Sequence, residues 1–382
     1  MRIRMAVILL FSVCSAGLAE QPPCRVPVNV VVPDLSSLPK PAADAMLAQW
    51  QQNMRAMKYQ GPDGRWDWAG QLSDFDNRLG FIAPPERTLV GNLPAEAFVA
   101  QSKKHPIRIL SATYDRGPRR LIFVAEKANK MPAAARKIEA AVICHILSKA
   151  RPEDSFALLT ARGARLELRF GSSREAVRAA AEELASPPQG KAGGQGVLDA
   201  ILEATTWFQP PQTGDSVLVV TMGLESRHKA GFSKVRAAVA AGGIRVFGFQ
   251  LGAYSVDSLS GGSNFDSLYI QGFGKISRLD QTFVLSEGSG GRAVLEDSQQ
   301  GKQYRLTDER LEELKNKGEM MYEEVTKYYA LQLDSVGPGL AVGLTQPVLS
   351  QLPWVLIYYP EYVLPCSSTA TTAAAETRSK QR

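Results

Sequence analysis

Residues 121–148 read LIFVAEKANKMPAAARKIEAAVICHILS and carry the strongest fold signal in the chain. The segment opens with four apolar residues, Leu121–Val124, which is typical of a strand covered on both faces of a sheet. Pro132–Ser148 follows as a predicted helix, and its second half is apolar nearly all round, which indicates burial. A buried strand followed by a buried helix is the building unit of an α/β fold.

The same alternation continues downstream. Further strands are predicted at 156–159, 164–170, 217–221 and 244–251, and further helices at 173–184, 197–206 and 233–241. A short turn containing glycine separates the first two of these strands, so they are expected to pair as a hairpin. Ser172 and Glu175 stand at capping-box spacing at the start of helix 173–184. This order predicts an α/β fold with a doubly wound, mostly parallel sheet.

The flanking segments favour strands. Predicted strands at 25–32 and 107–112 precede the alternating region, and a long polar helix at 306–327 follows it, with strands at 328–333 and 353–359. A helix at 41–57 and a loop at 59–70 are also expected. We therefore expect a smaller β-rich module formed by the N- and C-terminal segments. The expected divisions are a signal peptide at 1–19, the N-terminal β-rich module at 20–117, the α/β domain at 118–300, a C-terminal helix and strands at 301–366, and a disordered tail at 367–382.

The first residues resemble an export signal. Arg2 and Arg4 give a positive start, Met5–Val13 is a short apolar run, and Ala19 is a small residue suited to cleavage. The run is too short to span a bilayer comfortably, and no later stretch reaches that length. We expect a secreted or periplasmic protein with no stable membrane span in the mature chain.

The charge pattern argues against nucleic acid as a partner. The formal net charge is +6, and the positive residues are spread along the chain without a long Lys/Arg block. A basic tail or stripe is the usual electrostatic footprint of a nucleic-acid-binding protein. The sequence also contains no pattern that indicates a cofactor, and none is expected.

Three cysteines remain after the expected cleavage. Cys144 lies in the apolar helix and is expected to be a buried free thiol, with the neighbouring His145 pointing elsewhere. Cys24 and Cys366 lie near the two ends of the mature chain. Because export permits disulfides, we predict a bond between these two cysteines.

Several stretches together resemble a von Willebrand factor type A domain, in particular a secreted bacterial branch of that family. Leu121–Val124 corresponds to the first strand of the family, and residues 217–223 resemble its fourth strand and the following turn. The resemblance extends outside the domain to a short β module before it. The remaining matching stretches are 93–98, 107–109, 151–157, 193–200, 290–293 and 328–331.

The resemblance implies a metal-ion-dependent adhesion site, but the residues depart from that pattern. The family uses Asp-x-Ser-x-Ser, a threonine and a second aspartate, which are hard oxygen ligands suited to magnesium. The aligned positions here are Glu126, Ala128, Lys130, Gln195 and Met222. A lysine beside a dication is repulsive, and alanine and methionine supply no hard oxygen. We therefore expect a degenerate site without metal, in which Lys130 partly offsets the charge of Glu126.

These features favour a secreted, non-catalytic protein that binds a protein partner or acts as a scaffold. A metal-dependent adhesin with an atypical ligand set and a hydrolase with an unrecognised site are the alternatives. In open α/β sheets, ligands bind beyond the carboxyl ends of the strands. The candidate partner-binding residues at that edge are Glu126, Lys130, Gln195, Tyr254, Leu259 and Phe265.

Overall fold

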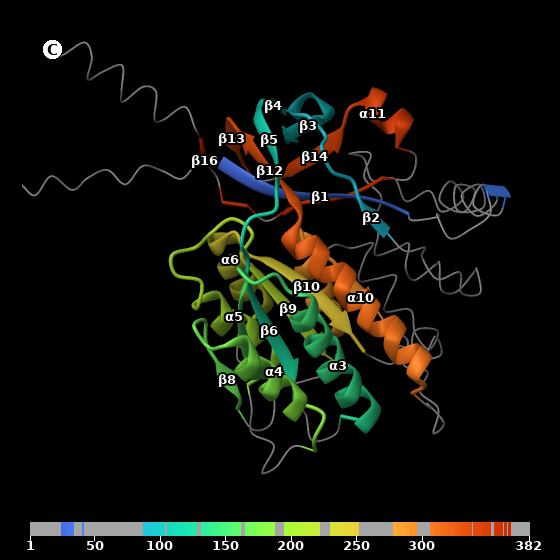
Figure 1. The fold of residues 1–382 in the computed structure, drawn as a ribbon. Helices are drawn as coiled ribbons and strands as arrows, with labels where there is room; N and C mark the ends of the chain where they lie inside the picture. Colours follow the sequence, from blue (N-terminus) through green and yellow to red (C-terminus); the bar gives the residue numbers. More distant parts are fainter. Residues whose placement is uncertain are drawn as a thin grey trace, which may run out of the picture.

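A six-stranded sheet forms the centre of the larger part of the molecule, and a second group of strands lies across one end of it (Figure 1). The protein is represented by a computed structural model, which describes residues 24–33, 40–41, 87–103, 105–127, 131–161, 165–187, 195–221, 230–251, 278–295, 306–337, 339–352, 355–361, 363–364 and 366–367.

The six-stranded sheet has the strand order β11-β10-β9-β6-β7-β8. Its first five strands in this order run parallel, and β8 is an antiparallel edge strand paired with β7. The α/β class expected from the sequence is therefore confirmed. In chain order the strands are β6 (Arg120–Glu126), β7 (Ser155–Ala161), β8 (Glu167–Leu168), β9 (Ser216–Thr221), β10 (Arg245–Gln250) and β11 (Ala293–Leu295).

Helices cover both faces of this sheet because successive residues of each strand point to opposite sides. In β6, Leu121 and Phe123 pack against α3 (Ala133–Lys149), α4 (Arg174–Glu183) and α10 (Asp308–Thr326). Ile122 and Val124 face the other layer. That layer consists of α5 (Val197–Thr205), α6 (Phe232–Gly242) and α9 (Arg278–Gly288).

Helix α10 lies along α3, and glycine sets the distance between the two helices. A Cβ atom on Gly318 would lie 2.7 Å from a methyl carbon of Val142, which real structures do not tolerate. Although the sequence of α10 is largely polar, Leu314, Met321 and Val325 are buried against the core. The helix is therefore amphipathic, and its apolar stripe belongs to the α/β layer.

We call the strands at the amino end of the large sheet, together with η1 and α11, the β module, and the rest the α/β part. The β module contains a sheet in the order β15-β1-β12-β5, with β2 also paired to β1, and a smaller sheet in the order β14-β3-β4. Strand β1 is central and buried, and its Val26 and Val28 pack with Tyr329 and Leu331 of β12. The elements are β1 (Cys24–Pro33), β2 (Arg87–Leu89), η1 (Ala95–Ala97), β3 (Phe98–Ser102), β4 (His105–Ile107), β5 (Ile109–Asp115), β12 (Tyr328–Leu333), β13 (Ser335–Val336), β14 (Leu340–Leu344), α11 (Gln346–Gln351), β15 (Leu356–Tyr358) and β16 (Cys366–Ser367).

A disulfide joins Cys24 to Cys366, the pair predicted from the sequence. Cys24 begins β1, and Cys366 begins β16, which pairs with β13. The two Cα atoms are 5.9 Å apart, within the usual range for a disulfide. The bond ties the N-terminal strand of the β module to its last strand.

Three details of the sequence prediction are corrected. The N-cap of α4 is Ser173, whose hydroxyl accepts the Ala176 N–H, so Ser172 and Glu175 form no capping box. The free thiol of Cys144 is only partly buried, because the helix turns this position toward α4, where Sγ contacts the Arg178 carbonyl. The strands expected at 164–170 and 353–359 shorten to β8 and β15.

Several expectations lie outside the described residues. They are the signal peptide, most of the helix at 41–57, the loop at 59–70, the loop around Tyr254, Leu259 and Phe265, and nearly all of the tail after residue 366. Within the described part, no helix is both long enough and apolar enough to cross a membrane.

Candidate functional site

Glu126 ends β6 at the carboxyl edge of the sheet and is fully buried. The parallel pairing of β6 with β9 brings Thr221, the last residue of β9, to the same edge. The Thr221 hydroxyl donates a hydrogen bond of 2.5 Å to Oε2 of Glu126. The Glu126 carboxylate is thus engaged by a neighbouring strand.

Glu139 lies beneath this edge, and the sequence analysis did not identify it. It projects from α3, is fully buried, and accepts the backbone N–H of Glu126 at 2.6 Å through Oε1. Burial raises the pKa of Glu139 well above its usual value, and the charge of Glu126 adds to this, against lowering by the hydrogen bond and by Lys127. Its other oxygen has no hydrogen-bond partner within the described residues. A neutral Glu139 therefore fits this site.

A sequence signal for Glu139 did exist. It stands three residues before Val142 and four before Ile143 in a helix that is otherwise apolar at these spacings. A carboxyl on the buried side of such a helix needs either a partner or a proton. The sequence alone did not show which strand end it would reach.

Lys127 provides a positive charge at this edge. Its ammonium lies 2.8 Å from Oε1 of Glu183 at the end of α4, and its backbone N–H bonds to the Ala161 carbonyl of β7. The expected pair was Glu126 with Lys130. Lys130, Ala128 and Met222 lie outside the described residues, so that pairing stays a prediction.

Gln195 and Asp199 shape the neighbouring loop. The Gln195 amide donates to Glu203 of α5 at 3.0 Å, so its side chain is engaged away from the strand end. Asp199 accepts the backbone N–H of Gly196 at 3.1 Å and of Ala230 at 2.6 Å, and so fixes the start of α5 to the start of α6. Asp199 is a positioning residue, and it lies in the 193–200 stretch that carries part of the family resemblance.

No cluster of three or more His, Cys, Asp or Glu side chains suited to a metal ion occurs within the residues that the structure describes. At the carboxyl edge, this part of the chain offers the buried carboxyls of Glu126 and Glu139 and two hydroxyls, those of Thr221 and Thr160. Thr160 accepts the backbone N–H of Leu166 at 2.7 Å.

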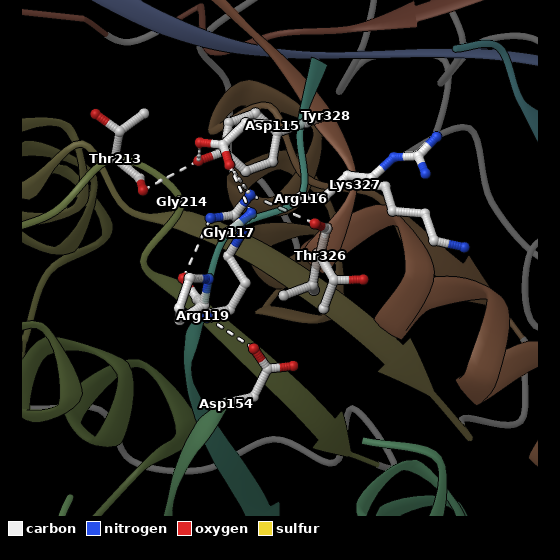
Figure 2. Close-up of polar contacts among 12 residues, drawn as sticks. Asp115, Arg116, Gly117, Arg119, Asp154, Thr213, Gly214, Thr326, Lys327 and Tyr328 are labelled. Atoms are coloured by element: carbon white, nitrogen blue, oxygen red, sulfur yellow. Dashed lines mark hydrogen bonds and ion pairs between the residues drawn. The ribbon is translucent and has the colours of Figure 1, made fainter. Parts of the chain in front are cut away.

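A second polar cluster occupies the amino end of the sheet (Figure 2). Arg119, which precedes β6, forms an ion pair of 2.8 Å with Asp115 of β5, and its backbone N–H bonds to Asp154 at 2.8 Å. Its guanidinium also donates to the Thr326 carbonyl at 3.4 Å. Burial would raise the pKa of Asp115, but the hydrogen bonds from Arg119 and from Gly117 outweigh burial and lower it.

Tyr328 lies at the centre of this cluster. Its ring is flanked by two guanidiniums, with those of Arg119 and Arg245 at 4.5 and 4.4 Å from the ring centroid. Its hydroxyl donates to the Thr213 carbonyl at 3.0 Å. The ring approaches Gly214 so closely that a Cβ there would lie 2.4 Å from the hydroxyl oxygen. This tyrosine of the β module thus inserts into the α/β part.

Arg245, the first residue of β10, is fully buried in the same cluster. Its guanidinium donates to Oδ1 of Asn29 at 2.7 Å and to the carbonyls of Glu324 and Val325 at 3.1 and 2.6 Å. Burial lowers the pKa of Arg245 to about 10, against the opposing influence of Tyr328. Arg245 is therefore charged at neutral pH.

Comparison with known proteins gives no family assignment. No family model matches the sequence, and no curated protein is significantly similar to it. The similar solved structures include an aerotolerance-related membrane protein from Bacteroides fragilis, with 17% identity, a TM-score of 0.38, and coverage of 54% of this chain and 98% of that one. BatB from Bacteroides thetaiotaomicron has 17% identity, a TM-score of 0.36, and coverage of 53% and 98%.

A third similar structure is the SpRpn10 VWA domain, with 10% identity, a TM-score of 0.34, and coverage of 53% of this chain and 96% of that one. All three TM-scores lie below 0.5, so these similarities decide nothing about function. Function must therefore be inferred from the residues of this chain.

Proposed function

We propose that this chain is an exported, non-catalytic protein that binds a protein partner or acts as a scaffold through a doubly wound, von Willebrand factor type A-like domain that needs no metal ion. The observation that carries the proposal is the state of Glu126. Its carboxylate is fully buried and accepts the Thr221 hydroxyl, and its backbone is held by Glu139.

This arrangement supports the metal-free part of the proposal. A metal-dependent adhesion site presents its carboxylate to an ion that also contacts the partner. Here, the carboxyl end of β6 is satisfied by β9 and α3 instead. A magnesium ion at this edge would also lack a hydroxyl and the second carboxylate of the family pattern, because Ala128 and Met222 carry no hard oxygen.

Two features of the chain support export. The first 19 residues have the charge and apolar pattern of a signal peptide. The disulfide between Cys24 and Cys366 suits an oxidising compartment, because such bonds are rare where thiols are kept reduced. We place the mature protein outside the cytoplasm, secreted or periplasmic.

The proposed contact face is the carboxyl edge of the six-stranded sheet. Glu126 is buried at this edge, Lys130 and Gln195 belong to it by sequence, and the 253–266 loop adds the apolar side chains Tyr254, Leu259 and Phe265. Ligands in open α/β sheets generally bind at this edge. The amino end is unsuited to the same role, since Arg119, Arg245 and Tyr328 fill it.

Calorimetric titration of magnesium and manganese into the mature protein tests the metal-free part. We expect no saturable heat with either ion, and no change on Glu126→Gln. Saturable binding that Glu126→Gln abolishes would overturn the proposal in favour of a metal-dependent adhesin.

A capture experiment tests the contact face. The immobilised mature protein is incubated with envelope extract, with and without EDTA, beside a variant lacking residues 258–263 and a matched surface variant, Arg178→Glu on α4. We expect EDTA and Arg178→Glu to leave the captured proteins unchanged. We expect the deletion to reduce the amount of protein captured, while the deletion variant keeps the melting temperature of the unmodified protein. Equal capture by all three proteins would exclude this edge as the contact face.

A further inference from the structure

The end of α10 joins the β module to the α/β part with almost no linker. The helix ends at Thr326, and β12 begins at Tyr328, so a single residue separates them. The last carbonyls of any helix have no partner inside the helix and carry partial negative charge. At this junction they point into the protein and require donors from elsewhere.

The donors come from different places in the sequence. Arg245 of β10 binds the carbonyls of Glu324 and Val325, and Arg119 binds that of Thr326. Asn29 of β1 donates to the carbonyls of Glu324 and Lys327 at 3.1 and 2.8 Å, and its own oxygen accepts from Arg245. One strand of the α/β part, the segment before β6 and one strand of the β module thus share one helix end.

The other described crossing between the two parts is held in a similar way. The chain passes from β5 to β6 through residues 116–119, and the carbonyls of Arg116 and Gly117 accept hydrogen bonds from Arg151. Arg151 is in turn paired with Asp154, which also binds the Arg119 backbone. Figure 2 shows Arg119 among Asp115, Asp154 and Thr326.

We infer that Arg119, Arg245 and Asn29 form a lock at the C-terminal end of α10, which makes the β module and the α/β part a single cooperative unit instead of two domains on a hinge. Separating the two parts breaks these hydrogen bonds together and exposes the side chains of Tyr328 and Arg245, which are fully buried, so it costs more than exposing an ordinary loop. Opening in one part is therefore coupled to opening in the other. In consequence, the carboxyl edge keeps one fixed orientation relative to the β module.

The disulfide provides a probe of this coupling, since Cys24 is buried in the β module and pairs there with β12 and Cys366. The rate at which dithiothreitol reduces the Cys24–Cys366 bond, followed by alkylation and mass spectrometry, reports opening of the β module. Leu158→Ala destabilises the α/β part from the centre of β7, and Ile122→Val in β6 is a milder alternative. Both positions are fully buried and remote in sequence from the disulfide.

In the protein with an intact lock, we expect Leu158→Ala to speed reduction roughly tenfold or more, because loss of a buried leucine side chain lowers the cost of cooperative opening. In proteins that already carry Asn29→Ala or Arg245→Met, adding Leu158→Ala should change the rate of disulfide reduction much less. The control substitutes an exposed arginine. In a protein that carries Arg178→Met, Leu158→Ala should still speed disulfide reduction roughly tenfold.

Two results would overturn the lock. One is a reduction rate that neither Leu158→Ala nor Ile122→Val changes in the otherwise unaltered protein. The other is an equal effect of these substitutions with and without Asn29 and Arg245. Circular dichroism of each variant confirms folding before the rates are compared, and Asn29→Ala serves alone where Arg245→Met does not fold.

Discussion

The two ends of the six-stranded sheet are built from similar residue types but used in opposite ways. At the amino end, Arg119 and Arg245 bond to groups contributed by the β module and by the end of α10. At the carboxyl end, Glu126 and Lys127 bond to Thr221 and Glu183 within the α/β part. Buried charged residues thus connect the β module to the α/β part at the amino end. At the carboxyl end they make contacts within the α/β part.

This difference shows that a charged residue at the end of a strand has no fixed structural role. Its role depends on what the tertiary structure places beyond the strand. The β module covers the amino end, so the guanidiniums there find buried carbonyls. At the carboxyl end, Glu126 and Lys127 find their partners within the α/β part, and the contact face proposed above lies at that edge. Substitutions at the two ends should therefore differ in their effects, and they are taken from the largest expected effect to the smallest.

Removing the disulfide should have the largest effect of these substitutions. It destabilises the β module, which covers the amino end of the sheet. The double substitution Cys24→Ser, Cys366→Ser should lower the free energy of unfolding by about 5 kcal/mol in the chain-entropy model, because the bond closes a very long loop. Urea unfolding followed by circular dichroism measures the loss. Cys144→Ser should cost far less, and an equal loss for both variants would contradict the prediction.

Arg245→Met should cost about 3–5 kcal/mol, since it leaves the Asn29 oxygen and the Val325 carbonyl buried without this donor. Urea unfolding at neutral pH is again the measurement. Arg178→Met on the surface of α4 is the matched control and should change stability by less than about 0.5 kcal/mol. A small effect at Arg245 would remove the distinction between the two ends.

Glu139→Gln tests the carboxyl end through pH. Burial, the largest cause, raises the folded-state pKa of Glu139, so the folded protein binds this proton more tightly than the unfolded chain does. The stabilising effect of the neutral form is complete below the unfolded pKa and is lost as pH rises toward the folded pKa. In that window the unmodified protein loses at most ~1.4 kcal/mol per pH unit through this group. The amide of the Glu139→Gln variant would keep an acceptor for the Glu126 N–H without that loss.

The measurement is the free energy of unfolding of both proteins from about pH 5 to pH 8. We expect the difference to move steadily in favour of Glu139→Gln as the pH rises. Glu167→Gln is the control, because the hydrogen bonds from Arg165 and Arg169 lower the pKa of Glu167. A difference at Glu139 that does not vary with pH would show that its carboxyl is charged in the folded state.

Ser173→Ala should cost about 1 kcal/mol, because Ser173 caps α4, whose far end supplies Glu183 to Lys127 at the carboxyl edge. Ser172→Ala should be close to neutral. Thermal unfolding of the two variants side by side measures both effects. A larger loss at Ser172 would restore the capping box that the sequence suggested.

Much of the fold was predictable because hydrophobic periodicity is a local property. The run Leu121–Val124 and the apolar helix after it form β6 and α3 in the structure, and the later alternation gives the same α/β class. The pair Cys24 and Cys366 was also accessible, since only these two cysteines flank the folded region. The serine cap was misplaced by one residue because adjacent serines are locally equivalent.

The candidate site was less predictable, since its contacts cross long stretches of chain. The sequence singled out Glu126 as a candidate, but it did not show that Thr221 and Glu139 would engage it. It gave no sign that Asn29 and Arg245 would meet at the end of α10. These partners are 216 residues apart along the chain.

The sequence by itself therefore determined the alternation of strands and helices between residues 121 and 251, because residue type and spacing are written in the chain. Only the tertiary structure decided which buried charges meet. Burial makes an unpaired charge or carbonyl costly, so the assembled fold selects the partners. Glu126 and Arg245 acquired their opposite roles at that step, one enclosed within the α/β part and the other joining it to the β module.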